Sequence, residues 1–324
     1  MDTILHNIIH YATKAPSDHN TQPWKFRVDN HSIYIYPDYT RLKHADADHH
    51  SLFISLGCAL ENLVVAANHF NLKETIHYNL DLPEEHIRVD LTPYVPAEKD
   101  NTLFMQLDKR QVNRAEYDGN PVPTDQLLDL VISCKEPSVF LKLFTDDRSK
   151  DNLLPFIEEA IKRQSKTKYY RQMLSEWVRF NNKEASIKKD GISGENLGVP
   201  GAPSWIGKLI LNSILDPQAQ IDKVNKLVKS SPVMMMFIAL KQDKTSWVKL
   251  GRCYENIALK ATAMGISHAH INMPCEVSEV REKLKNEFGF SVEEPLLMLR
   301  MGYAQPLPKS LRRELEDVMV KSDA

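Results

Sequence analysis

The sequence has no excess of basic residues, because its 41 Lys and Arg face 43 Asp and Glu, a formal net charge of −2. A chain with this balance offers no broad cationic surface for a phosphate backbone, so we expect no nucleic-acid partner. Long apolar runs are also missing, since the longest, Val233 to Leu240, is too short to cross a bilayer. Met1–Thr3 shows no basic stretch ahead of a cleavable apolar segment. We therefore expect a cytoplasmic protein without a membrane partner.

Cysteine pairs at the spacing of metal or redox motifs are absent as well. The four cysteines, Cys58, Cys134, Cys253 and Cys275, lie far apart and include no C-x-x-C. Their separation predicts four reduced thiols in a reducing compartment, and no metal site is expected. With 324 residues, of which 42% are hydrophobic and 26% charged, the chain can form two ordinary globular domains or one large one.

The most distinctive stretch is residues 15–26, with the sequence APSDHNTQPWKF. Its turn-forming residues and prolines predict a loop between an amphipathic helix, with apolar residues at Ile4, Leu5, Ile8, Ile9 and Ala12, and a strand that begins at Trp24. Hydroxyl and amide groups gather there beside an aromatic ring, which suits a flat ligand with polar edges. A well-packed turn with an Asn cap is the plain alternative.

The residues that follow this loop, up to residue 91, predict a β-hairpin, a buried helix and two further strands. Asp29-Asn30 separates two alternating runs, as in a tight hairpin. Residues 51–70 are apolar on nearly every side, which predicts a helix buried all round, ended by a left-handed Asn71. The preceding run 46–50, DADHH, invites a metal interpretation, but Asp48 is placed as a helix N-cap. Strands are expected at 75–80 and 87–91.

The rest of the chain predicts helices and strands around one irregular segment. Thr124 opens a helix, and residues 151–182 are expected to be helical. Too many Gly and Pro follow at 189–203 for regular structure, so this segment is either a surface connection or a mobile cover over a site. The expected later elements are strands at 139–145, 233–240 and 296–301 and helices at 251–264 and 277–288.

A short motif, G-x-x-x-E-N, occurs at residues 57–62 and again at 251–256. In the same register Ala67 matches Ala261, and the helix end at Asn71 matches Gly265. Agreement in motif, helix length and cap type indicates a tandem duplication of one α+β unit. Two unrelated buried helices that share Glu-Asn would be the alternative.

The pattern AP-S-x-x-N-x-QPW-x-F resembles the flavin-binding loop of the nitroreductase superfamily of FMN-dependent oxidoreductases, most of all its Acg-type branch. The resemblance implies an α+β, nitroreductase-like fold in which two tandem units form an intrachain pseudo-dimer. Each unit would have a central, mostly antiparallel sheet packed with helices. The implied units are 1–106 and 107–324, with a lid-like insertion at about 165–205. A further homodimer is possible on this view.

The same resemblance implies one FMN between the two halves. The loop of the first half would meet the arginine segment of the second, residues 109–114. The first half keeps the family's loop but no arginine segment, and the second half keeps the arginine segment but only an eroded loop. Guanidinium and ammonium groups suit the phosphate. The implied cofactor-binding residues are Pro16, Ser17, Asn20, Gln22, Arg110, Arg114, Ile271, Asn272, Met273, Lys309, Arg312 and Arg313.

In function, the resemblance implies hydride transfer from NAD(P)H to a small-molecule acceptor, nitroaromatic or quinone-like. Such transfer needs stacking and positioning more than a dedicated acid or base, so no catalytic residue is predicted. His268 and His270 could protonate a substrate, although packed histidines are commoner. Two alternatives stay open: a flavin-sequestering protein with a lid and little turnover, and a scaffold that binds no flavin.

Overall fold

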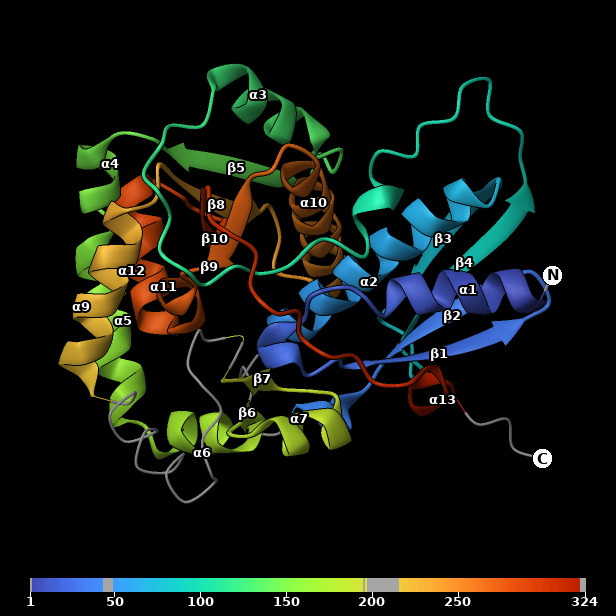
Figure 1. The fold of residues 1–324 in the computed structure, drawn as a ribbon, viewed down its shortest axis with the longest axis horizontal. Helices are drawn as coiled ribbons and strands as arrows, with labels where there is room; N and C mark the ends of the chain where they lie inside the picture. Colours follow the sequence, from blue (N-terminus) through green and yellow to red (C-terminus); the bar gives the residue numbers. More distant parts are fainter. Residues whose placement is uncertain (1, 43–48, 195, 197–215, 321–324) are drawn as a thin grey trace.

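The computed structural model describes residues 2–42, 49–194, 196 and 216–320, which form two four-stranded antiparallel sheets on either side of two long helices. The helices are α2 (His50–His69) and α10 (Lys244–Ala263), and Figure 1 shows them together between the sheets. By length and a hydropathy of 1.5, α2 could cross a membrane, yet 94% of its apolar window is buried in the fold. The burial explains why α2 is apolar all round.

The first sheet has the strand order β1-β2-β4-β3, and every pairing is antiparallel. The hairpin predicted at Asp29-Asn30 is confirmed, with Asn30 in the left-handed region at φ 53°. One face of α1 is fully buried, although Ile4 is exposed. The elements are α1 (Asp2–Ala12), η1 (Asp18–Asn20), β1 (Trp24–Asp29), β2 (Ser32–Pro37), η2 (Tyr39–Arg41), α2, β3 (Leu72–Asn79), β4 (His86–Pro93) and η3 (Phe104–Gln106).

The second sheet has the order β5-β8-β10-β9, again wholly antiparallel. Leaving the insertions aside, both halves run helix, strand, strand, long helix, strand, strand, with the last two strands exchanged in the sheet. The duplication predicted from G-x-x-x-E-N therefore extends to the topology of the whole unit. The elements are α3 (Thr124–Ser133), β5 (Val139–Phe144), β8 (Val233–Ala239), α10, β9 (Ser267–His270), β10 (Glu294–Gly302) and α13 (Leu315–Val318).

Two insertions enlarge the second half. The longer one, between β5 and β8, contains α4 (Asp147–Asp151), α5 (Leu154–Lys166), α6 (Lys168–Trp177), β6 (Val178–Arg179), α7 (Asn182–Lys188), β7 (Ile192–Ser193) and α9 (Pro217–Lys229). The shorter one, between β9 and β10, contains α11 (Met273–Glu276) and α12 (Ser278–Phe288). Strand β8 is buried on both faces because Met235 and Phe237 face α10 while Met234 and Met236 face the inserted helices.

The repeated glycines lie where α2 and α10 cross. A methyl group on Gly57 would lie 2.0 Å from the Val248 carbonyl oxygen, and one on Gly251 would lie 2.0 Å from the Ile54 carbonyl oxygen. The two helices thus approach too closely for any side chain, and glycine is required at both positions. This contact explains why the motif begins with glycine in each half.

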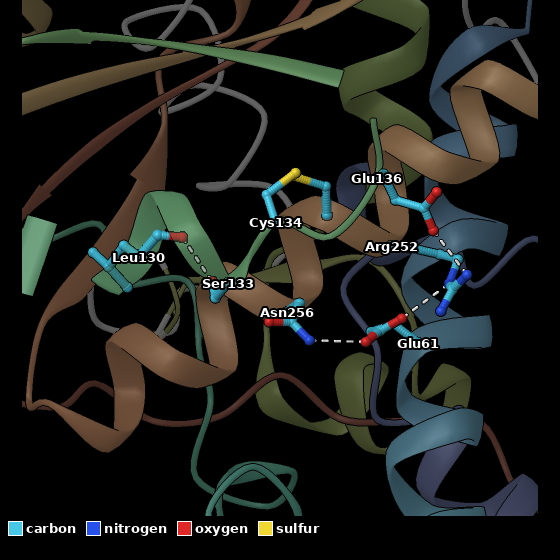
Figure 2. Close-up of a disulfide and its surroundings, with 8 residues drawn as sticks. Glu61, Leu130, Ser133, Cys134, Glu136, Arg252 and Asn256 are labelled. Atoms are coloured by element: carbon cyan, nitrogen blue, oxygen red, sulfur yellow. Dashed lines mark hydrogen bonds and ion pairs between the residues drawn. A yellow bond between two sulfur atoms is a disulfide. The ribbon is translucent and has the colours of Figure 1, made fainter. Parts of the chain in front are cut away.

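The Glu-Asn pairs of the motif bind one another across the same crossing. Asn256 Nδ2 donates to Glu61 Oε1 at 2.9 Å, and Asn62 Nδ2 donates to Glu255 Oε1 at 2.9 Å. Each glutamate also forms an ion pair with an arginine. Arg252 Nε lies 2.9 Å from Glu61 Oε2, and Arg110 Nε lies 2.9 Å from Glu255 Oε1. Figure 2 shows the pair of Arg252 and Glu61. The Glu and Asn residues of the motif therefore join the two halves through hydrogen bonds and ion pairs.

The prediction of four reduced thiols is wrong for two of them. Cys134, after α3, and Cys253, on α10, form a disulfide (Figure 2), whereas Cys58 and Cys275 are free and buried. The bonded residues are 119 positions apart, and only the packing of α3 on α10 brings them together. The spacing of the thiols consequently gives no indication of a reducing compartment.

Several element boundaries differ from the expected ones. Helix α10 begins at Lys244 rather than Gly251, because Asp243 caps it by accepting the Ser246 N–H at 2.7 Å. The expected helix 151–182 is broken at Thr167, which caps α6, and gives way to strand β6 after Trp177. The residue that caps α2 is His49, and Asp48 lies outside the described residues.

Candidate functional site

The loop after α1 is held in a strained conformation. His19, Asn20 and Gln22 have φ values of 47°, 55° and 52°, in the left-handed region that is uncommon outside glycine, although Asn and His adopt it more often than most residues. Ser17 Oγ accepts the Gln22 N–H at 2.9 Å and closes the turn. Strain of this kind persists only where the surroundings fix it, and it is concentrated at functional sites.

Two side chains of the loop supply the bonds that fix it. Asn20 Nδ2 donates to the Gly191 carbonyl at 3.0 Å and to the Leu311 carbonyl at 3.1 Å. Gln22, which is fully buried, donates to the Lys189 carbonyl at 2.9 Å and accepts the Arg313 N–H at 2.8 Å. The loop therefore joins the long insertion to the C-terminal tail.

The arginine segment runs beside β9 in the second half. The Asn113 N–H donates to the His268 carbonyl at 2.9 Å, and Arg110 and Arg114 line the same cavity as Ser17 of the loop. Arg110 is buried, and its Nη2 donates to the Lys14 carbonyl at 3.0 Å. Arg110 thus joins Glu255 of α10 to the start of the loop.

The C-terminal tail crosses from the second sheet to the first. The Val320 N–H donates to the Phe26 carbonyl at 2.7 Å, so the tail extends the edge of the first sheet at β1. On the way it carries Arg312 over the loop, where Nη2 donates to the Lys14 carbonyl at 3.0 Å and Nη1 to Asn20 Oδ1 at 3.1 Å. Lys309 bonds the Asp108 carbonyl.

Two adjoining cavities lie between these segments, with volumes of about 240 and 510 Å³. Residues from the loop, the arginine segment and the insertion line both of them: Pro16, Ser17, Val112, Arg114 and Ile192. The larger cavity is rich in cationic side chains, and the smaller one is lined by apolar and aromatic residues together with at least as many polar ones. A cleft of this composition suits a ligand with an anionic end and a flat ring.

The structure brings most of the predicted site residues to this cleft. The smaller cavity is lined by Asn272 and Met273, and the larger one by Asn20, Arg110, Lys309, Arg312 and Arg313, in addition to the shared Pro16, Ser17 and Arg114. Gln22 and Ile271 line neither cavity. Gln22 is buried and bonds the backbone of Lys189 and of Arg313, and Ile271 packs in the core beside α11.

Positive charge in the larger cavity is poorly compensated. Burial, together with the charge of Arg110, lowers the pKa of Arg312 to about 9. Burial likewise lowers the pKa of Arg114. Arg110 Nη1 and Arg312 Nε are buried without a hydrogen-bond partner among the described residues. Such unpaired buried donors fit an anion at this place, because it would satisfy them and restore the arginine pKa values.

The two histidines named as possible proton donors are both held neutral. His268 is buried, its Nε2 lies 3.3 Å from Tyr254 Oη, and burial lowers its pKa well below the ordinary value. His270 lines the smaller cavity, but burial and Arg114 lower its pKa to about 3. Neither imidazole is therefore in its protonated, positively charged form near neutral pH, which is the form that would donate a proton.

The structure adds a polar group that sequence reasoning missed. His19 Nδ1 lies 2.6 Å from Asp18 Oδ1, and both residues line the smaller cavity. Glu276 of α11 lines it too and accepts hydrogen bonds from Gln164 at 2.8 Å and Asn272 at 3.2 Å. The signal for the first two lay inside the conspicuous loop, in the residues between Ser17 and Asn20. Nothing in the sequence indicated that Glu276 would join them.

The buried Glu255 predicts a pH-dependent stability. Burial raises its pKa to about 7 against the opposing charge of Arg110, from an ordinary value of 4.5. Between these two pH values the folded state binds a proton that the unfolded state has lost, so the free energy of unfolding falls as pH rises. Denaturant unfolding at several pH values checks this: relative to Glu255→Gln, the wild type should lose stability over that window. Parallel pH curves for the two proteins would contradict the assignment.

The comparisons with known proteins cover the whole chain. It is 25% identical to the Mycobacterium tuberculosis H37Rv protein named "Putative NAD(P)H nitroreductase Rv3131", over 97% of this chain and 90% of that one. The M. tuberculosis H37Rv protein named "Putative NAD(P)H nitroreductase acg" is 22% identical over 97% of this chain and 95% of that one. These relatives confirm the resemblance to the nitroreductase superfamily and its Acg-type branch that the sequence shows. No protein-family model matches the chain.

Solved structures also align with parts of this chain. The FMN-dependent nitroreductase NfnB from Mycobacterium smegmatis in complex with NADPH aligns with a TM-score of 0.44 and 13% identity, over 68% of this chain and 98% of that one. A nitroreductase with bound FMN from Bacteroides fragilis aligns with a TM-score of 0.42 and 14% identity, over 69% of this chain and 100% of that one.

Proposed function

We propose that this protein is an FMN-dependent oxidoreductase that transfers hydride from NAD(P)H to nitroaromatic or quinone-like acceptors, with one FMN in the cleft between its halves. The supporting observation is that Ser17 of the first half and Arg114 of the second line both cavities of one cleft. When bound, FMN would supply the two-electron chemistry between the nicotinamide and the acceptor. The names of the M. tuberculosis relatives agree with this activity.

Different residues along the cleft would bind different parts of the FMN. Arg312 and Arg110, with their unpaired buried nitrogens, would hold the phosphate, assisted by Lys309 and Arg313. Arg114, where the two cavities join, would place positive charge that favours a reduced flavin. Asn272 and Met273 would border the ring, and Asn20 would fix the loop rather than bind a ligand alone.

We also propose that the units are residues 1–106 and 107–324, acting as an internal pseudo-dimer. The repeated topology and the reciprocal Glu-Asn bonds support this division. The long insertion interrupts the second unit between the strands that correspond to the hairpin of the first. One site would be complete, because the loop is supplied by one half and the arginine segment by the other.

The direct test is whether the protein binds FMN and turns it over. Purified protein should show flavin absorption bands and oxidise NAD(P)H when a nitroaromatic or quinone is added. Arg312→Gln should weaken FMN binding by about tenfold or more, since a charge-assisted hydrogen bond to phosphate is worth about 1.5–3 kcal/mol. Arg27→Gln is the matched control, because Arg27 on β1 lines neither cavity and its guanidinium carbon lies 4.3 Å from the centre of the Tyr34 ring on β2. A colourless protein would refute the proposal, as would equal FMN affinity in the two variants.

One feature favours flavin sequestration as a second function. Tyr170 and Ile192 of the long insertion line the smaller cavity, and Gly191 is bonded to Asn20 of the loop. An insertion bound in this way would cover the ring and restrict access for nicotinamide. Tightly bound FMN without NAD(P)H oxidation would favour sequestration over catalysis.

A further inference from the structure

The smaller cavity holds an ion pair that neither the phosphate-binding nor the ring-binding residues explain. The backbone of His19 is in the left-handed region at φ 47°, and its side chain is only 19% exposed. Because Asp18 bonds Nδ1, Nε2 is the ring nitrogen that remains for a ligand in the cavity that His19 lines. A backbone held under strain in order to present an imidazole there points to a role for that imidazole.

The charges around His19 favour its protonated form. Burial alone would lower its pKa, but Asp18 at 2.6 Å, together with Glu276, outweighs burial and raises it. In the described part of the chain, the other ionisable groups that face the pair are Glu276 on α11, Arg114 of the arginine segment, His270 on β9, His50 on α2 and Tyr170 on α6. Of these, Glu276 acts in the same direction as Asp18, and Arg114 opposes it.

We propose that His19 is the general acid that protonates the acceptor during its reduction, with Asp18 as the residue that keeps it charged and oriented. The inference rests on the proposed function, in which NAD(P)H is the reductant. It differs from the sequence-based expectation, which named no catalytic residue. On this proposal the proton donor lies in the smaller cavity. That cavity is lined by the loop, by Gln164 and Tyr170 of the insertion, and by Glu276.

The atoms and electrons of the proposed step balance when the acceptor is a quinone. The quinone receives a hydride that derives from NAD(P)H, which brings two electrons and one hydrogen. The second hydrogen is the proton on His19 Nε2: that N–H bond breaks, an O–H bond forms on the acceptor oxygen, and the imidazole becomes neutral. His19 then regains a proton from solvent, and the products are a hydroquinone and NAD(P)+.

The experiment separates the two half-reactions by anaerobic stopped flow. In His19→Gln, re-oxidation of the flavin by a quinone should slow by about 100-fold near neutral pH relative to reduction of the flavin by NAD(P)H, the usual contribution of a general acid. His77→Gln is the matched control, since His77 on β3 also pairs with an aspartate, Asp90 at 3.0 Å, but lines neither cavity. Asp18→Asn keeps the shape of the pair and should shift the loss of re-oxidation rate to lower pH.

A second measurement does not depend on activity. NMR titration of labelled histidines should show His19 with a pKa above that of an exposed histidine, and Asp18→Asn should lower it. Unchanged re-oxidation and an unchanged pH profile in His19→Gln, with flavin reduction intact, would overturn the proposal and leave the function standing. If the wild type shows no flavin reduction, the proposed function fails instead, and an ordinary NMR pKa for His19 overturns the ion-pair assignment separately.

Discussion

Gly57→Ala should prevent the two halves from packing in their present geometry. Its new methyl group would lie 2.0 Å from the Val248 carbonyl oxygen and 2.9 Å from the Gly251 Cα, both backbone atoms of a buried helix. Neither atom can move without shifting α10, so the cost should reach about 3 kcal/mol, the upper end for overpacked cores. Denaturant unfolding followed by far-UV circular dichroism measures the loss, and Gly251→Ala should behave alike.

The matched control for this prediction is Gly265→Ala. Gly265 ends α10 at φ 74°, and a methyl group there meets nothing within 4 Å. It should cost only about 1 kcal/mol, from the left-handed backbone alone. If Gly57→Ala were no more harmful than Gly265→Ala, the close crossing of the two helices would be wrong.

Arg110→Met should damage both stability and flavin binding. The substitution leaves Glu255, which is fully buried, without its arginine at 2.9 Å. Breaking a buried ion pair from one side costs about 3–5 kcal/mol, and the larger cavity loses one of its two guanidinium groups with an unpaired nitrogen. Thermal unfolding and the FMN dissociation constant measure the two effects separately.

A double variant distinguishes the two roles of Arg110. In Arg110→Met/Glu255→Gln no uncompensated charge remains, so most of the lost stability should return, whereas FMN affinity should not. Glu255→Gln alone serves as the control and should retain FMN. Full recovery of FMN affinity in the double variant would show that Arg110 supports the fold and does not bind the phosphate.

Local patterns in the sequence determined a large part of the fold. Asp29-Asn30 predicted its hairpin, and the repeated G-x-x-x-E-N predicted a duplication that extends to the strand order of both sheets. These predictions succeeded because turn residues, apolar periodicity and repeats act through near neighbours in the chain. The APSDHN loop also marked the place of the candidate site.

Contacts between distant residues were decided only by the tertiary structure. The disulfide of Cys134 with Cys253 and the hydrogen bond of Gln22 to the Lys189 carbonyl each join parts of the chain more than a hundred residues apart. The strained backbone that presents His19 likewise depends on the insertion and the tail. No local pattern encodes such pairings, because they arise from how whole helices and sheets pack. The sequence thus determined the two units and the loop, and packing decided which side chains meet in the cleft between them.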